Sequence, residues 1–251
     1  MIPSAPDFSV NSQDSSTQGV TNIRRKVWDL PVRLFHWLLV VSFAGAYLTN
    51  WLGISWFKYH EWFGYAVTVL VTFRILWGFF GTWYARFANF VRSPIATWRY
   101  TINLLRGKET TTAGHNPLGA LMVLFFLVAL LIQAVTGLFA NDEIFNAGAL
   151  YGYVSNEVSL QLTALHKELF YWIFAATVIH VLAVLFHVFF KNENLISAMV
   201  TGYKTGGEPL RGAPSIDSSF GLRATILLAL VSVTLFLLVS FAPSASLDMD
   251  Y

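Results

Sequence analysis

Residues 165–191 read LHKELFYWIFAATVIHVLAVLFHVFFK, an apolar stretch with no Pro or Gly. At a rise of about 1.5 Å per residue, a helix of this length crosses a bilayer. His166, His180 and His187 follow one another at steps of fourteen and seven residues, which are nearly whole numbers of turns. Their imidazoles therefore share one face, with His166 and His180 about 21 Å apart along the axis. Because polar groups at membrane depth are costly and usually functional, this pattern predicts a metal ligand near each side of the membrane.

The composition is that of a membrane protein. The chain is 55% hydrophobic and 12% charged, with 22 Phe and 9 Trp, which is more than a soluble domain of 251 residues normally carries. Cysteine is absent, which excludes disulfides, cysteine-ligated iron–sulfur clusters and the C-x-x-C-H attachment of c-type haem.

Apolar runs of about 20 residues predict five membrane helices. We expect them at residues 31–51, 60–81, 117–139, 165–191 and 222–241. Residues 1–23 are polar and without periodicity, so we predict a disordered tail. Within the basic connection 82–116, residues 94–105 are a candidate amphipathic helix at the membrane surface. The connection 191–221 is expected to be a Gly-rich basic loop.

The distribution of Lys and Arg predicts the orientation. With these five helices, 14 of the 16 Lys and Arg residues fall on one side, and only Lys58 and Lys167 fall on the other. Such a bias marks the cytoplasmic side, so the N-terminus is expected in the cytoplasm and the C-terminus outside. The acidic loop 140–165 then lies on the outer side, where it is a candidate docking surface.

Matching the depths of the histidines gives two candidate pairs. His60 and His166 open their helices on the outer side, whereas His36 and His180 lie deeper, towards the inner side. Two such pairs, one above the other, fit the axial ligands of two bis-imidazole haems in a four-helix bundle. Depth alone leaves His187 as a rival of His180, since it lies only seven residues further in.

Three other polar residues gather near the predicted inner pair. Arg74, His115 and His187 are candidate contacts of a haem propionate or of a quinone. The alternatives are structural: the side chain of Arg74 extends to the lipid headgroups, and the two histidines form hydrogen bonds at the interface.

Several motifs together resemble the bacterial cytochrome b561 family, which includes the b-type cytochrome subunits of Ni,Fe-hydrogenases. They are PVRLFHW (31–37), HEWFGY (60–65), RILWG (74–78), GHNPLG (114–119) and HKELFYWIFAATVIHVLAVLFH (166–187). The resemblance covers residues 25 to 205 and implies a four-helix membrane bundle with two haems b. It also implies a bacterial inner membrane, so that the outer side, with the C-terminus, is the periplasm. It also implies that the ligands are His36, His60, His166 and His180, and so favours His180 over His187. The polar N-terminal tail and the fifth helix depart from the family pattern.

The expected fold is an all-α integral membrane protein, a four-helix di-haem transmembrane bundle plus a fifth C-terminal transmembrane helix. Its parts are a cytoplasmic tail (1–23), the di-haem cytochrome b domain (24–205), a cytoplasmic linker (206–221) and the fifth helix with a periplasmic tail (222–251).

The expected function is transfer of electrons between a periplasmic redox partner, such as a c-type cytochrome or a hydrogenase, and the quinone pool. The resemblance supplies the quinone. The partners are thus membrane lipid, quinone and a redox protein, with no nucleic acid. One alternative is a stand-alone superoxide:quinone oxidoreductase, which the few outer cations disfavour. The other is a non-haem metal transporter, for which mid-membrane carboxylates are missing.

Overall fold

A computed structural model of the protein describes residues 23–108, 114–206 and 214–243. In these ranges, five helices are long and apolar enough to cross a membrane, which confirms the prediction of an all-α membrane protein. They are α1 (Leu30–Trp51), α2 (Phe57–Phe80), α5 (Pro117–Leu138), α6 (Asn156–Phe190) and α8 (Gly221–Ser240). The predicted tails, residues 1–22 and 244–251, lie outside the described residues.

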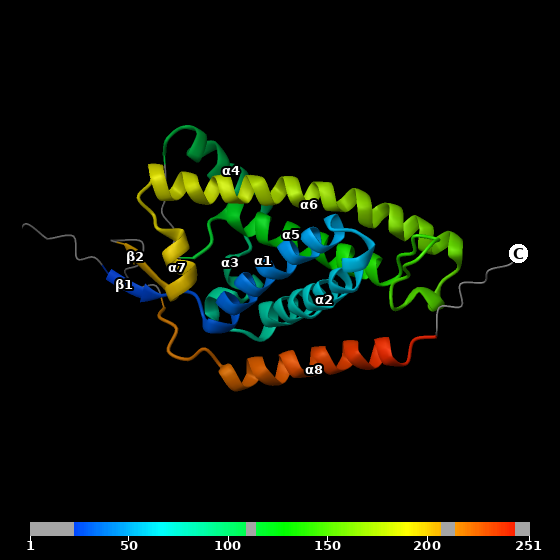
Figure 1. Cartoon of the computed structure of the whole chain (residues 1–251). Helices are drawn as coiled ribbons and strands as arrows, with labels where there is room; N and C mark the ends of the chain where they lie inside the picture. The colour runs from blue at the N-terminus through cyan, green and yellow to red at the C-terminus, as the bar shows by residue number, and fades with distance from the viewer. Residues whose placement is uncertain (1–22, 109–113, 207–213, 244–251) are drawn as a thin grey trace, which may run out of the picture.

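Four of these helices form an antiparallel bundle, and α8 lies on its outside. Helix α1 packs on α2, α2 on α5, and α5 on α6, while α8 packs on α2 on the side away from α6 (Figure 1). The core between the helices is apolar, with Val71, Trp77 and Ile173 almost completely buried. Van der Waals packing of such side chains holds membrane helices together, because lipid tails are as apolar as the side chains themselves.

The starts of the spanning helices follow ordinary capping chemistry. The side chains of Asp29, Asn116 and Ser155 each accept a hydrogen bond from a backbone N–H three residues later. Pro31 and Pro117 occupy the first turns, where a missing N–H costs nothing. Asp29 is therefore the N-cap of α1.

Helix α6 is longer than predicted, because it begins at Asn156 rather than Leu165. Its first turns are polar, so they are not part of the apolar run from which the helix is predicted. Two hydrogen bonds nevertheless attach these turns to the preceding loop. Ser159 donates a hydrogen bond to the Phe139 carbonyl (2.7 Å), and the Thr163 hydroxyl accepts one from the backbone N–H of Asn141 (2.9 Å). The prediction of a loop over residues 140–165 is therefore wrong for residues 156–165, which are helical. His166 accordingly lies well inside a helix rather than at its start.

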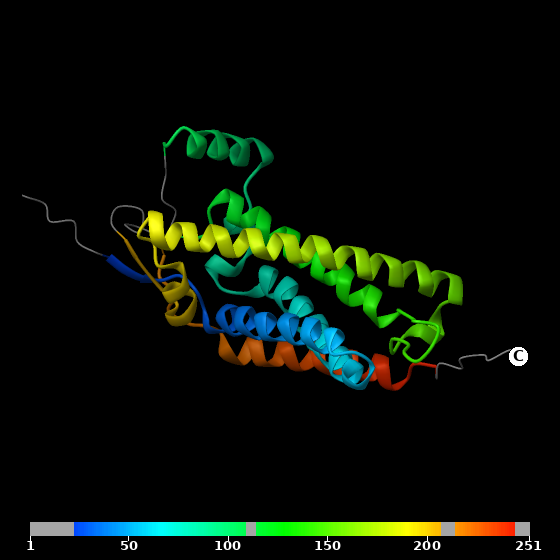
Figure 2. The ribbon, with the colours of Figure 1, turned by 45° about the horizontal axis from the view of Figure 1, so that its top comes forward.

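The start of α2 differs from the prediction, whereas α4 has the predicted bounds. Helix α2 begins at Phe57, ahead of His60, after a single 3-10 turn at Ile54–Trp56. Helix α4, Pro94–Leu105, has the bounds predicted for an amphipathic helix and projects away from the bundle (Figure 2). It is preceded by a 3-10 turn, Trp83–Ala85, and the short helix α3, Phe87–Phe90.

A small sheet joins the beginning of the described chain to the segment after α6. Strand β1 (Ile23–Lys26) pairs antiparallel with β2 (Tyr203–Gly206), and helix α7 (Leu195–Thr201) precedes β2. The carbonyl of Gly202, whose φ of 88° suits glycine, accepts hydrogen bonds from the N–H groups of Val27 and Trp28. The prediction of a Gly-rich basic loop at 191–221 is thus wrong for α7 and β2, because elements of seven and four residues leave no readable periodicity.

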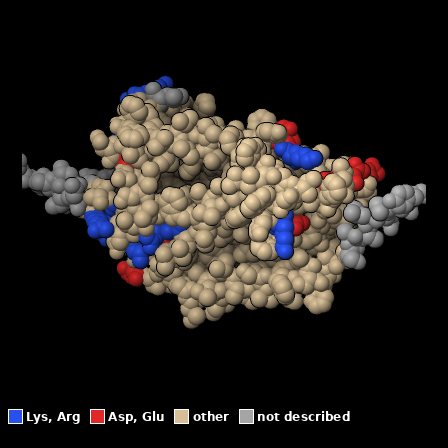
Figure 3. Space-filling view, in the orientation of Figure 1, with Lys and Arg blue, Asp and Glu red and all other residues tan. Residues whose placement is uncertain are grey.

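The two ends of the bundle differ in charge. We call the basic end the one that holds β1, β2, the start of α1 and the end of α2, where most Lys and Arg side chains gather (Figure 3). The acidic end holds the loop 139–155 with Asp142 and Glu143. All spanning helices run between these ends.

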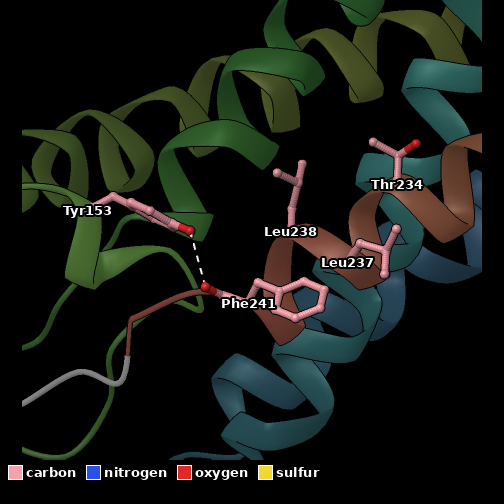
Figure 4. A pocket seen from close by; sticks show the side chains of 5 residues that line it. All are labelled: Tyr153, Thr234, Leu237, Leu238 and Phe241. Carbon is pink, nitrogen blue, oxygen red and sulfur yellow. Dashed lines mark hydrogen bonds between the residues drawn. The ribbon is translucent and has the colours of Figure 1, made fainter.

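Helix α8 is attached at the acidic end as well as along α2. The Tyr153 hydroxyl donates a hydrogen bond to the Phe241 carbonyl (3.3 Å), beside a shallow apolar groove (Figure 4). Gly152 lies so close to Pro243 that a Cβ at residue 152 would stand 2.7 Å from the Pro243 carbonyl oxygen. The fifth helix is therefore docked on the bundle at its last turn.

Candidate functional site

The histidines predicted to match in depth lie opposite one another in the bundle. The ring centroids of His36 (α1) and His180 (α6) are 6.5 Å apart, towards the basic end. The ring centroids of His60 (α2) and His166 (α6) are 6.3 Å apart, towards the acidic end. Helix α6 contributes to both pairs, and its fourteen-residue spacing separates them by about 21 Å along its axis.

The spacing within each pair fits one metal ion held between two imidazoles. With metal–nitrogen bonds of about 2.0 Å on opposite sides of an ion, the ring centroids are about 6 Å apart. Among the described residues, no group of three or more His, Cys, Asp and Glu side chains comes together to hold a metal ion. Two protein ligands alone suit an ion whose other positions are filled by a macrocycle, as in bis-histidine haem.

The pair near the acidic end has hydrogen bonds that orient both rings. His60 Nδ1 lies 2.8 Å from the Ala46 carbonyl, and His166 Nδ1 lies 2.9 Å from the Gln133 carbonyl. Such a bond to the far nitrogen fixes the tautomer of a metal-binding histidine and leaves Nε2 for the metal. The Gln133 amide nitrogen lies 3.2 Å from His166 Nε2, on the side where a metal would bind.

The pair near the basic end lies in a more apolar environment. His36 Nδ1 is buried without a hydrogen-bond partner, and the Phe126 ring meets the edge of His180 at 5.9 Å. A buried nitrogen without a hydrogen-bond partner is costly, so His36 lacks the orienting contact that both rings of the acidic-end pair have.

Helices α1 and α6 are not closely packed along their backbones and meet through long side chains. Between the two histidine pairs, the Tyr47 ring stacks on Phe170 at 5.6 Å, and Phe43 stacks on Phe170 at 6.2 Å. Aromatic side chains therefore fill the interface between α1 and α6 in the region between the two histidine pairs.

Glycines leave space beside the histidines of the acidic-end pair. A Cβ on Gly64, one turn after His60, would meet nothing within 4 Å. A Cβ on Gly137 would stand 2.8 Å from Cε1 of His166. These roles could not be predicted from the residue type, because glycine is common in membrane helices for several reasons.

The structure places Arg74 inside the protein rather than among the headgroups. Its side chain is 2% exposed, donates to the Ala85 carbonyl at 3.2 Å and lies near Asp29. Asp29 is 1% exposed, and its Oδ2 accepts hydrogen bonds from Trp77 Nε1 (3.0 Å) and Thr82 Oγ1 (2.6 Å). Sequence analysis missed this network, although an acid directly before a membrane helix is an available signal.

The other two candidate contacts lie apart from each other. His115 is held between the rings of Trp28 and Phe90, at 4.6 and 4.7 Å, close to Arg74. His187 Nδ1 lies 3.2 Å from the Ala183 carbonyl of its own helix. The structure thus brings His115 to the Arg74 network but gives His187 no described contact with that network.

Because His115 is buried, the stability of the protein is expected to depend on pH. Burial, then Arg74 and Lys204, lower its pKa from 6.5 to about 3. The folded protein therefore keeps the ring neutral where the unfolded chain binds a proton, so stability is complete above pH 6.5 and falls as the pH drops towards 3. His115→Phe should flatten this decline by at most about 1.4 kcal/mol per pH unit, measured as the unfolding midpoint in detergent between pH 7 and about 5. An unchanged slope in the variant would contradict the assignment.

Comparison with known proteins gives one family and several relatives. A family model described as "Prokaryotic cytochrome b561" matches residues 27–202. The probable Ni/Fe-hydrogenase 1 B-type cytochrome subunit of Escherichia coli K12 is 24% identical over 212 residues, covering 71% of this chain and 90% of that protein. The probable Ni/Fe-hydrogenase B-type cytochrome subunit of Azotobacter vinelandii is 26% identical over 210 residues, covering 71% and 87%. No solved structure gives a significant match.

Proposed function

Because the chain belongs to the prokaryotic cytochrome b561 family, we propose that it binds two haems b and carries electrons across the membrane, between the quinone pool and a redox protein at its acidic end. The family makes it a membrane b-type cytochrome of electron transfer. The observation that supports two haems is the presence of two histidine pairs, at 6.5 and 6.3 Å, on one long helix.

The proposed ligands are His36 with His180 and His60 with His166. Haem b, when bound, would supply a one-electron iron couple, and the two imidazoles of each pair would hold it. The carbonyls of Ala46 and Gln133 hold the acidic-end imidazoles in one tautomer.

The proposed partner surface is the acidic-end loop. Asp142 and Glu143 are exposed there, next to Ile144 and Phe145, which are 67% and 66% exposed. An apolar tip flanked by acids suits a partner with a basic rim around an apolar patch. The matched relatives are hydrogenase cytochrome subunits by name, so a hydrogenase or a c-type cytochrome is the class of partner that we propose.

The proposed quinone site lies at the basic end. At this end His115 offers an imidazole that can exchange a proton with a quinone, and the nearby Arg74 supplies a fixed positive charge. We assign this end to the cytoplasm from its excess of Lys and Arg. A reporter fused after Tyr251 should then be periplasmic and one placed before Arg24 cytoplasmic; the reverse result would overturn the orientation.

The haem content tests the proposed function directly. Purified protein should show a low-spin b-type spectrum and about two haems per chain, and a quinol should reduce it. A content of about one haem per chain would show that one of the histidine pairs does not bind haem. A protein without haem would overturn the proposal altogether.

Gly137→Ala is expected to weaken the acidic-end site specifically. The added methyl group meets Cε1 of His166 at 2.8 Å, so the ring must move away from its hydrogen bond to Gln133. Retention of one haem should fall about 10–100-fold, in line with the loss of an orienting contact. The haem content after dilution into detergent checks this, with Gly221→Ala as the control, since a Cβ there meets nothing within 4 Å.

A further inference from the structure

Both imidazoles of the acidic-end pair donate a hydrogen bond to a backbone carbonyl. His60 Nδ1 lies 2.8 Å from the Ala46 carbonyl oxygen, and His166 Nδ1 lies 2.9 Å from the Gln133 carbonyl oxygen. Because a carbonyl oxygen can only accept, each ring carries its proton on Nδ1 and leaves Nε2 free to bind a metal. A histidine that donates in this way is a more basic metal ligand.

The basic-end pair is without such bonds among the described residues. His36 Nδ1 is buried without a hydrogen-bond partner. The described contacts of His180 are with the rings of His36 and Phe126, at 6.5 and 5.9 Å between centroids. The two pairs therefore offer the same ligand atoms, but only the acidic-end imidazoles are made more basic by a hydrogen bond.

Helix α5 carries no histidine, yet it adds to this difference. Phe126 and Gln133 are seven residues apart, which is about two turns, so they share one face of the helix. Phe126 contacts His180, whereas the Gln133 amide nitrogen lies 3.2 Å from His166 Nε2. The Gln133 Oε1 is buried without a hydrogen-bond partner. One face of α5 therefore gives the basic-end site an aromatic ring and the acidic-end site a polar amide.

We propose that these contacts give the acidic-end haem a lower midpoint potential than the basic-end haem, an inference that rests on the proposed content of two haems. Ferric haem carries one more positive charge than ferrous haem. More basic ligands and a polar amide stabilise the ferric state and so lower the potential. Apolar surroundings without these contacts disfavour the extra charge and raise the potential. Because both proposed sites have two imidazole ligands, ligand identity does not separate the potentials.

The charges at the two ends of the bundle act in the same direction. Asp142 and Glu143 lie at the acidic end, whereas most Lys and Arg side chains gather at the basic end (Figure 3). Acids favour the ferric state and cations the ferrous state, but exposed charges are screened by salt and weigh less than groups in contact with the rings. An electron shared by the two sites would therefore rest at the basic end, where the quinone site is proposed.

Redox titration of single-haem variants tests the order of the two potentials. His180→Ala should keep the acidic-end haem and His60→Ala the basic-end haem, so that each midpoint is measured alone. At the same solution potential, the ferric-to-ferrous ratio should be at least about tenfold higher in His180→Ala, which is about 59 mV for one electron. Equal midpoints or the reverse order would overturn the inference. Either result, together with about two haems per wild-type chain, would leave the proposed function intact.

Gln133→Leu tests the part of the amide, because it removes the side-chain amide and keeps the backbone carbonyl. The ferric-to-ferrous ratio of the acidic-end haem should fall about threefold at a given potential, while the basic-end midpoint stays unchanged as an internal control. Gln161→Leu is the matched control, since it removes an exposed amide from α6, five residues before His166. It should change neither midpoint.

A histidine methylated at Nδ1, introduced at position 60 through an expanded genetic code, tests the part of the carbonyls. It keeps Nε2 for the iron but cannot donate to the Ala46 carbonyl, so the acidic-end midpoint should rise towards that of the basic-end haem. The same replacement at position 180 removes no described hydrogen bond and should have the smaller effect. Unchanged acidic-end midpoints in this protein and in Gln133→Leu would show that these contacts do not set the order. If the methylated protein loses the haem, Gln133→Leu decides alone.

Discussion

His180→Ala is expected to lower the haem content of the purified protein from about two to about one per chain, because one imidazole holds a low-spin haem poorly. His36→Ala should have the same effect, since the two rings face each other at 6.5 Å. The spectrum that remains should be that of the acidic-end site, whose histidines lie about four turns away along α6. Pyridine haemochrome assay and redox titration of each variant measure both quantities.

His187→Ala is the matched control, because it removes an imidazole from the same helix and the same face. His187 lies about 10 Å beyond His180 along the axis and contacts the Ala183 carbonyl of its own helix. Its loss should leave both haems bound. If His187→Ala lost a haem and His180→Ala kept both, the ligand assignment would be reversed.

The sequence was sufficient for the spanning helices and for pairing the histidines by depth. Helical periodicity puts His166 and His180 on one face, and hydropathy puts His36 and His60 at matching depths in other helices. The structure brings the same pairs together, although it moves the start of α6 from Leu165 to Asn156. Depth matching is insensitive to that error, because it depends on spacing within the helix and not on where the helix begins.

Contacts between distant segments could not be predicted in the same way. The pairing of β1 with β2 joins residues about 180 positions apart through four-residue strands, too short to show a period. The network around Asp29 combines the start of α1 with the end of α2, and nothing in either segment alone indicates the other. Arg74 shows the consequence: its sequence position allowed a side chain in the headgroups, whereas the packing of Ala85 and Asp29 around it keeps it buried.

Asp29→Ala is expected to cause the largest loss of stability among single substitutions at the basic end, about 3–5 kcal/mol. The carboxylate caps α1 through the N–H of Val32 (2.7 Å) and accepts hydrogen bonds from Trp77 and Thr82. Removing it takes away the cap and leaves two buried donors without an acceptor, which adds a desolvation cost to the lost bonds.

The same substitution also leaves a positive charge uncompensated. Arg74, 2% exposed, has Asp29 as its electrostatic partner, and a buried cation without an anion costs more than a lost neutral hydrogen bond. The free energy of unfolding in mixed micelles, followed by helical circular dichroism, measures the total. Trp77→Phe removes one donor and leaves the carboxylate in place, so it should cost only about 1 kcal/mol. Equal losses in the two variants would show that Asp29 acts only through its bond to Trp77 and not as the centre of the network.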